Sequence, residues 1–182
     1  DILNLVYIAK SLGLNEVAEY WHQVIKINNY QKIRFAKNIM KSLFNTVSGK
    51  KISLLGWAFK KNTNDSRESA AIYIADYLIE NGAEIHVYDP KVTYSRMLSD
   101  LNDLGTRTNV KNRENLFYHN TPLPACFKSH AIAVLTEWDE FKTYNWEEIF
   151  DISIKPAKLF DGRNILDKKK LEAIGYEVYS IG

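Results

Sequence analysis

Residues 51–56 of the chain are Lys-Ile-Ser-Leu-Leu-Gly (KISLLG), a short apolar run that ends at a glycine. Such a run predicts a buried strand over 52–55, because a strand of a parallel sheet is covered on both faces. Residues 68–81 follow with apolar side chains at helical spacing and a glycine behind them, which predicts an amphipathic helix. Residues 85–88 predict a second strand. A strand, a helix and a strand in this order indicate a parallel sheet.

The same alternation continues to the end of the chain. Further strands are predicted at 116–118, 131–135, 158–160 and 177–180, and further helices at 94–101, 122–128, 146–150 and 168–173. Six strands are enough for a doubly wound sheet. The fold class that we predict is therefore α/β, with a six-stranded, doubly wound, parallel sheet of the Rossmann-like type.

Two helices are predicted before the sheet. The first ends near Gly13, and the second runs from about residue 15 to residue 44, or roughly 45 Å at 1.5 Å per residue. Such length exceeds the need of a small domain, so we expect its apolar stripe to be covered by something outside the sheet domain, in a homodimer or larger homo-oligomer. The stripe consists of Val17, Trp21, Val24, Phe35, Ile39 and Leu43. The predicted domains are a helical segment, 1–48, and a sheet domain, 49–182.

Composition narrows the classes of partner. The 182 residues carry a net charge of +2, which gives no reason to expect a nucleic acid or a membrane as partner. The single cysteine, Cys126, cannot form an internal disulfide, and a reducing, cytoplasmic location fits. No base lies beside Cys126 in the sequence, so an inert buried thiol is expected. The four histidines lack metal-ligand spacing, so no metal site is predicted.

Ligands of a doubly wound sheet bind beyond the carboxyl ends of its strands. The loop 56–69 lies at such an end, but it is long and has only Gly56 where a dinucleotide fold has several glycines. We therefore expect no NAD site of the usual Rossmann kind in this domain. Lys60, Lys61 and Arg67 offer positive charge to an anionic ligand, and Phe59 offers a surface for stacking. A solvated basic loop with Phe59 in the core is the alternative.

Arg163 follows Asp161 and Gly162 at another predicted strand end. Glycine allows close approach of a ligand there, and arginine binds phosphate through two hydrogen bonds. The alternative is a surface arginine paired with a nearby aspartate. If both loops act together, their cations converge on one diphosphate. Asp89, which precedes Pro90, is expected to be a turn residue, since the glycine-rich turn that would accompany a ribose-binding acid is missing.

Four segments, in this order, resemble the nucleotide-sugar dehydrogenases of the UDP-glucose/GDP-mannose dehydrogenase family. They are the loop 56–69 (GWAFKKNTNDSRES), residues 87–91 (VYDPK), residues 136–141 (TEWDEF) and residues 160–164 (FDGRN). The start of the chain, 1–7 (DILNLVY), is similar to the run after the catalytic cysteine loop of that family. The likeness covers essentially the whole chain and is greatest to the animal-type enzymes that act on UDP-glucose.

The resemblance implies a two-step oxidation of UDP-glucose to UDP-glucuronate with two NAD, through a covalent intermediate on a cysteine. It implies that Phe59, Lys60 and Arg163 bind the substrate. Arg67 would reach NAD, which a preceding domain holds, and Asp1 would help to activate water as a base. A long helix would form the dimer contact. Trp57 differs from the residue that the family often has there.

The resemblance also places the attacking cysteine about four residues before Asp1, and the NAD domain before that. We therefore expect this chain to be inactive alone and to bind UDP-sugar at best weakly. Two alternatives stay open: a dehydrogenase for UDP-N-acetylmannosamine or GDP-mannose, and the nucleotide-binding half of a glycosyltransferase. A receiver domain is excluded, because it needs acidic residues where this chain has Gly56, Trp57 and lysines.

Overall fold

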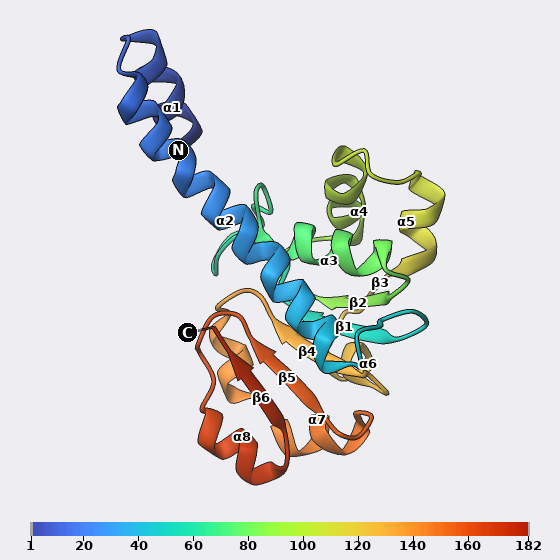
Figure 1. Ribbon diagram of the computed structural model, residues 1–182. Helices are drawn as coiled ribbons and strands as arrows, with labels where there is room; N and C mark the ends of the chain where they lie inside the picture. Colours follow the sequence, from blue (N-terminus) through green and yellow to red (C-terminus); the bar gives the residue numbers. More distant parts are fainter. Residues whose placement is uncertain (1, 182) are drawn as a thin grey trace.

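A computed structural model describes residues 2–181 of the chain. Two helices come first, α1 (Ile2–Ser11) and α2 (Asn15–Ser42), and a sheet domain follows (Figure 1). The strands of that domain are β1 (Lys51–Leu55), β2 (Glu84–Tyr88), β3 (Leu116–Tyr118), β4 (Ala131–Val134), β5 (Lys158–Asp161) and β6 (Glu177–Ser180). Its helices are α3 (Ala70–Glu80), α4 (Tyr94–Asp103), α5 (Asn109–Asn115), α6 (Pro122–Cys126), α7 (Trp146–Ile152), α8 (Lys168–Ile174) and the 3-10 helix η1 (Asp139–Thr143).

The six strands form one sheet in the order β3-β2-β1-β4-β5-β6, and all neighbouring strands are parallel. The predicted fold class, with six strands at the predicted places, is thus confirmed. The strand order reverses between β1 and β4, whose last residues lie side by side at Leu55 and Val134. In a doubly wound sheet this switch point is where ligands bind, because the loops from β1 and β4 leave in opposite directions.

Helix α2 has two halves with different surroundings. Phe35, Ile39 and Leu43 of its C-terminal half are buried in the main hydrophobic core, and the ring of Phe35 meets the ring of Phe160 in β5 edge-on at 6.0 Å. The expectation that this stripe needs cover from outside the sheet domain is wrong for this half. Here the sheet has a face that α2 covers, and α3 packs beside it.

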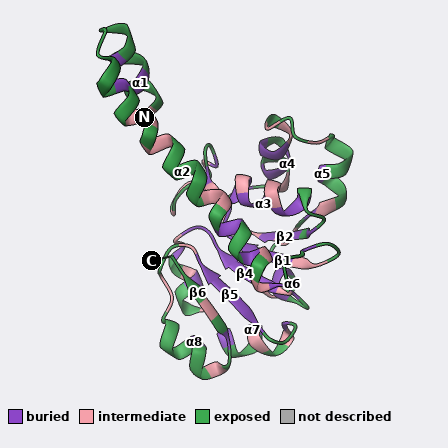
Figure 2. Cartoon of the chain, in the orientation of Figure 1, coloured by how far each residue is buried: buried purple, intermediate pink, exposed green. Residues whose placement is uncertain are grey.

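The N-terminal half of α2 projects beyond the sheet domain and pairs with α1, as Figure 2 shows by its mostly exposed surface. A small separate core holds the two helices together through Val6, Ala9 and Ala18, with Trp21 and Ile25 packed against it. We call this helical hairpin, residues 2–27, the arm. Among residues 2–181, no helix combines the length and apolar character that crossing a bilayer requires.

Candidate functional site

A cleft of about 1060 Å³ opens between α2 and the carboxyl ends of β1, β4 and β5. We call it the main cleft. Phe59, Arg67 and Arg163, three of the predicted site residues, line it together with Gly162. The expected juxtaposition of the loops after β1 and β5 is therefore seen. The position agrees with the rule that ligands bind at the switch point of a doubly wound sheet.

Arg163 is the best-held cation of the main cleft. Its Nε donates to the carbonyl oxygen of Leu135 at 2.7 Å, and its Nη2 donates to the carbonyl oxygen of Phe59 at 3.2 Å. The Glu137 carboxylate lies 3.4 Å from Nε, and both side chains are about one-third exposed. An arginine has five N–H groups, so three remain for a ligand. A fixed guanidinium with free donors suits a phosphate or diphosphate.

Phe59 stands at the turn of the loop 56–69 and is 49% exposed. Its backbone N–H donates to the carbonyl oxygen of Asp65 at 2.8 Å, which closes the tip of the loop. The alternative of a core-packed Phe59 is therefore wrong. An exposed aromatic residue and a fixed guanidinium in one cleft offer a stacking surface and a charge to one ligand.

Lys60 and Arg67 differ in their settings. Lys60 is exposed, does not line the main cleft and has no hydrogen-bond or ion-pair partner within residues 2–181. Arg67 is 79% exposed and pairs with Asp65 at 2.7 Å. The hydrogen bonds from Arg67 lower the pKa of the Asp65 carboxyl to about 2. Asp65 thus fixes the orientation of the Arg67 guanidinium, which stays exposed to solvent.

Asp1, the predicted base, lies outside the described residues. Its neighbour in the sequence, Ile2, lines the main cleft.

Lys32 of α2 is a cleft residue that the sequence analysis did not identify. Its ammonium lies 3.8 Å from the centre of the Tyr73 ring and 3.7 Å from the Glu68 carboxylate. Burial lowers the pKa of Lys32, with Glu68 opposing the shift. This group ties α2 to the loop that bears Arg67. The helical stripe did not point to Lys32, because its partners come from elements 36 or more residues away.

The loop 56–69 is held by side chains of one other segment, residues 136–139. Thr136 donates from Oγ1 to the carbonyl oxygen of Ala58 at 2.7 Å, and Glu137 accepts from the Lys61 N–H at 3.2 Å. Lys61 also pairs with Asp139 at 2.7 Å. The segment 136–139 therefore braces the loop, and in the sequence only the resemblance pointed to it.

Asp89 makes the largest set of contacts in this region. Its side chain, 1% exposed, accepts from the backbone N–H groups of Trp57 and Ala58 at 2.6 and 2.9 Å. The expected turn role is also present, since Lys91 and Val92 donate their N–H groups to its other oxygen, both at 2.8 Å. The amides that a glycine-rich turn would offer to NAD are thus already engaged. NAD does not fit at this turn.

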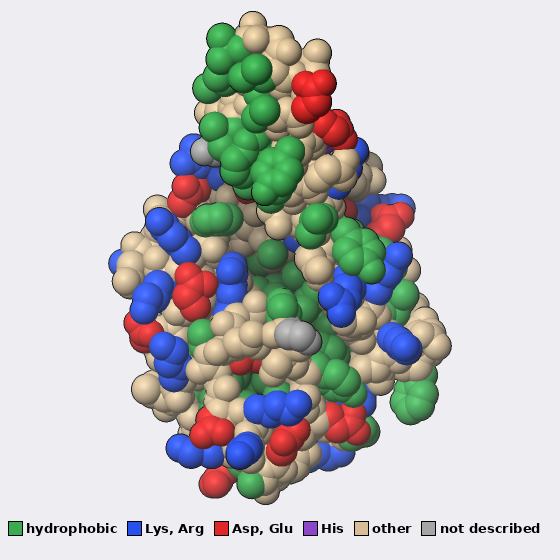
Figure 3. Space-filling view, turned by 60° about the vertical axis from the view of Figure 1, so that its left-hand side comes forward, with side chains coloured by type: hydrophobic (Ala, Val, Ile, Leu, Met, Phe, Trp, Pro, Cys, Tyr) green, Lys and Arg blue, Asp and Glu red, His purple; other side chains and the backbone are tan. Residues whose placement is uncertain are grey.

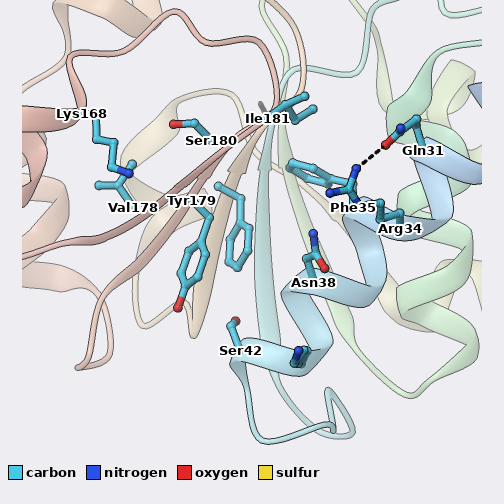
Figure 4. A pocket seen from close by; sticks show the side chains of 12 residues that line it. Gln31, Arg34, Phe35, Asn38, Ser42, Lys168, Val178, Tyr179, Ser180 and Ile181 are labelled. Carbon is cyan, nitrogen blue, oxygen red and sulfur yellow. Dashed lines mark hydrogen bonds between the residues drawn. The ribbon is translucent and has the colours of Figure 1, made fainter.

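A second cleft of about 610 Å³ lies between α2 and the β5–β6 edge of the sheet (Figure 4). Arg34 and Tyr179 line it, and Arg34 donates to Gln31 at 3.1 Å. Phe59, Lys60, Arg67 and Arg163, the predicted site residues that the structure describes, do not line this second cleft.

The chain matches known proteins over its whole length. It is 47% identical over 184 residues to the UDP-glucose 6-dehydrogenase of Gallus gallus and 50% identical over 183 residues to that of Caenorhabditis elegans. Each alignment covers 100% of this chain but 37% of the relative. The structure of a UDP-glucose dehydrogenase from Pyrobaculum islandicum has the same fold, with a TM-score of 0.69 at 23% identity over 99% of this chain and 35% of that one.

The match to a protein family is also direct. Residues 53–168 match the UDP-binding domain of the UDP-glucose/GDP-mannose dehydrogenase family. That range contains the loop 56–69, Asp89, the brace 136–139 and Arg163. A glycosyltransferase is excluded by this match. The chain belongs to the UDP-glucose/GDP-mannose dehydrogenase family.

Proposed function

We propose that the main cleft binds the UDP part of UDP-glucose. The observation that carries this proposal is Arg163, which is held by Leu135 and Phe59 and keeps three N–H groups free at the cleft. A diphosphate accepts such bidentate contacts, and the exposed Phe59 lines the same cleft. Lys60, the next residue of the loop, is exposed outside the cleft and would add positive charge near its rim. The same set of residues is what the resemblance implied.

The chain is, on this proposal, the part of an NAD-dependent dehydrogenase that binds the nucleotide of the substrate. The relatives are named UDP-glucose 6-dehydrogenases, and this chain spans 37% of their length. NAD would supply hydride acceptance, and its binding site would belong to another part of such a protein. Arg67, exposed and aimed by Asp65, is the residue of this chain that we propose to contact it. Asp1 is proposed as the base.

Solved structures of dehydrogenases for other nucleotide sugars share this fold. Solved structures of UDP-N-acetylmannosamine dehydrogenases from Staphylococcus aureus and of GDP-mannose dehydrogenase from Pseudomonas aeruginosa are 19–20% identical to this chain. The identity of 47–50% to the UDP-glucose enzymes favours UDP-glucose. A titration with UDP, GDP and UDP-glucose separates the choices, because tighter binding of GDP would contradict the proposal.

Calorimetric titration of UDP into this chain tests the site. Arg163→Ala is expected to weaken UDP binding about 10–100-fold, the effect of losing hydrogen bonds to a charged group. Arg34→Ala is the matched control, since Arg34 lines the second cleft and should leave UDP affinity unchanged. Equal affinity in the Arg163→Ala variant and the unsubstituted chain would refute the site.

We also propose that the chain forms a homodimer through the arm. Large apolar side chains are exposed there and gather on one end of the molecule (Figure 3). Those of the arm include Tyr7, Leu12, Leu14, Val17 and Tyr20. A patch of this kind is typical of a protein interface.

A further inference from the structure

The turn after β1 contains an anion-binding arrangement that is filled from within the chain. Successive N–H groups of Trp57 and Ala58 point to one oxygen of Asp89, at 2.6 and 2.9 Å. The indole Nε1 of Trp138 donates to the same oxygen at 3.2 Å. Successive backbone amides that converge on one point form a nest that binds anions, and in dinucleotide folds the anion is a ligand phosphate.

The second oxygen of Asp89 is held equally well. It accepts from the N–H groups of Lys91 and Val92, both at 2.8 Å. Five N–H donors therefore surround one carboxylate that is 1% exposed, and within residues 2–181 no lysine, arginine or histidine forms an ion pair with it. The charge is balanced by dipoles alone, a setting in which removal of the carboxylate leaves several buried donors without acceptors.

The held segment leads directly into the main cleft. Asp89 fixes the backbone at Trp57 and Ala58, and the next residue, Phe59, provides the ring and the carbonyl oxygen that holds Arg163. The loop is further fixed by Trp57, whose indole donates to Asp100 at 2.9 Å. The position of Arg163 relative to Phe59 thus depends on the turn that Asp89 closes.

We infer that Asp89 is a built-in anion that replaces a ligand phosphate in the turn after β1 and acts as a positioning residue for Phe59 and Arg163. One consequence is that the turn after β1 cannot bind the phosphates of a dinucleotide, because Asp89 occupies its N–H groups. The other is that the nucleotide of a UDP-sugar is directed to the far side of the loop, into the main cleft. This second consequence rests on the proposed function.

Chemical rescue tests the inference. Asp89→Ala is expected to leave a cavity lined by five N–H donors, to lower UDP affinity at least tenfold at a temperature where circular dichroism shows a folded chain, and to regain that affinity in sodium formate. Formate supplies a carboxylate of the right size. Sodium pivalate has the same charge but is too bulky, and it should not restore binding. Asp89→Asn fills the cavity with an NH₂ group facing donors, so formate should not rescue it.

A matched destabilised variant separates positioning from stability. Leu171→Ala removes a side chain that is 3% exposed. Leu171 lies in α8, which leads into the edge strand β6, and β4 and β5 separate β6 from β1 and the loop 56–69. It should lower the melting temperature without changing UDP affinity. If Leu171→Ala weakened UDP binding as much as Asp89→Ala at equal loss of melting temperature, Asp89 would be a structural residue only.

Backbone amide exchange gives a readout that does not need UDP. In Asp89→Ala the amides of Trp57, Ala58, Lys91 and Val92 should lose protection, and formate should restore it. If the unsubstituted chain binds no UDP while this pattern holds, the proposed function fails and the built-in anion stands. If formate restores neither protection nor UDP affinity, the inference about Asp89 is overturned. If Asp89→Ala does not fold by itself, its refolding yield is compared in formate and in pivalate. A higher yield in formate supports the inference, and equal yields overturn it.

Discussion

Gly56 is the residue at which the backbone of β1 leaves the sheet toward the main cleft. Its φ is +98°, and a Cβ atom built on it would lie 2.5 Å from the Thr136 side chain and 2.7 Å from the Thr136 backbone nitrogen. Both the conformation and the contact oppose any side chain. We expect Gly56→Ala to lower the free energy of unfolding by about 2–4 kcal/mol.

Urea denaturation of Gly56→Ala beside Gly105→Ala separates the two causes. Gly105 has a φ of +66° but nothing within 4 Å of a built Cβ, so its substitution should cost only about 1 kcal/mol. Equal losses in the two variants would show that the close approach to Thr136 has no effect.

Cys126 gives a second prediction for a single residue. It is completely buried, and burial raises the pKa of its thiol to about 12. The native chain should therefore not react with a disulfide reagent such as DTNB at pH 8, and one thiol should react after unfolding in guanidinium. Rapid reaction of the folded chain would contradict this prediction. Such an inert thiol cannot act as the nucleophile of the proposed reaction.

The sequence indicated the residue types of the site better than their contacts. Phe59 and Arg163 could be selected because they follow predicted strands, and the carboxyl ends of parallel strands share one edge. Lys60 follows the same strand but does not line the cleft, since the loop turns at Phe59. Asp89 joins Trp57 across 32 residues, and Arg163 joins Phe59 across 104. Spacing along a chain carries no information about such pairs.

At the scale of elements, a pair of histidines joins β2 to the end of β3: His86 lies in β2, and His119 directly follows β3. His86 stacks on Phe117 with ring centres 4.5 Å apart, and its Nδ1 lies 2.8 Å from Nε2 of His119. Burial, with the charge of Lys51 and then His119 as lesser causes, lowers the pKa of His86 to about 3. Burial also lowers the pKa of His119. Glu84, 3.9 Å away, is the acidic side chain nearest to His86 among the ion pairs of this edge.

This pair should make the chain less stable in mild acid. The unfolded state takes up a proton on His86 near pH 6.5, whereas the folded state does not until about pH 3. Stability from His86 is therefore complete above pH 6.5 and is lost as the pH falls below it. Between pH 7 and pH 5 we expect His86 to account for about 1–2 kcal/mol of the loss.

Urea denaturation at pH 7 and pH 5 measures this loss. His86→Phe keeps a ring to stack on Phe117 and should reduce the pH dependence. His22→Gln is the control, because the His22 side chain is 42% exposed and its replacement should leave the pH dependence as it was. An unchanged dependence in His86→Phe would show that the pair does not govern it.

The elements themselves followed from sequence pattern where apolar residues recur, and not elsewhere. All six strands were found: β1 to β5 present buried apolar side chains to the core, and β6 packs the half-buried Val178 against it. Helix α5 was missed, since its one buried residue is Asn112, which bonds to Asn102 and Arg107. The 3-10 helix η1 was missed because five residues are too few to show a period. Helix α2 was found, but its apolar stripe packs against α1 in the N-terminal half and against the main core in the C-terminal half.

At the scale of the whole molecule, the arm and the sheet domain are joined by one continuous helix. The C-terminal half of α2 is part of the main core, so its direction is fixed by the sheet. The other half carries the arm away from that core (Figure 1). The main cleft lies where the two parts meet, since Ile2 and Ile25 of the arm line it together with Arg163. An event that moves the arm would therefore also change the cleft.

The exposed surface of the arm predicts association with a second copy of this chain. Tyr7 and Tyr20 are 74% and 66% exposed, and the small core of the arm is limited to residues such as Val6, Ala9 and Ala18. Burial of such rings stabilises an interface by about 25 cal/mol per Å² of apolar surface, before the cost of association. We expect sedimentation equilibrium to give a dimer for the unsubstituted chain.

Charge on the arm should prevent that dimer. Tyr7→Glu with Tyr20→Glu places two carboxylates on the contact surface, where burial without partners is unfavourable, so this double variant should sediment as a monomer with unchanged circular dichroism. Val110→Glu is the matched control: Val110 is 64% exposed but lies in α5 of the sheet domain, so the dimer should persist. A monomeric unsubstituted chain, or a dimer that survives the double variant, would show that the arm is not the interface. Because the arm also lines the main cleft, the monomeric variant should bind UDP more weakly only if the second copy helps to fix Ile2 and Ile25 in place.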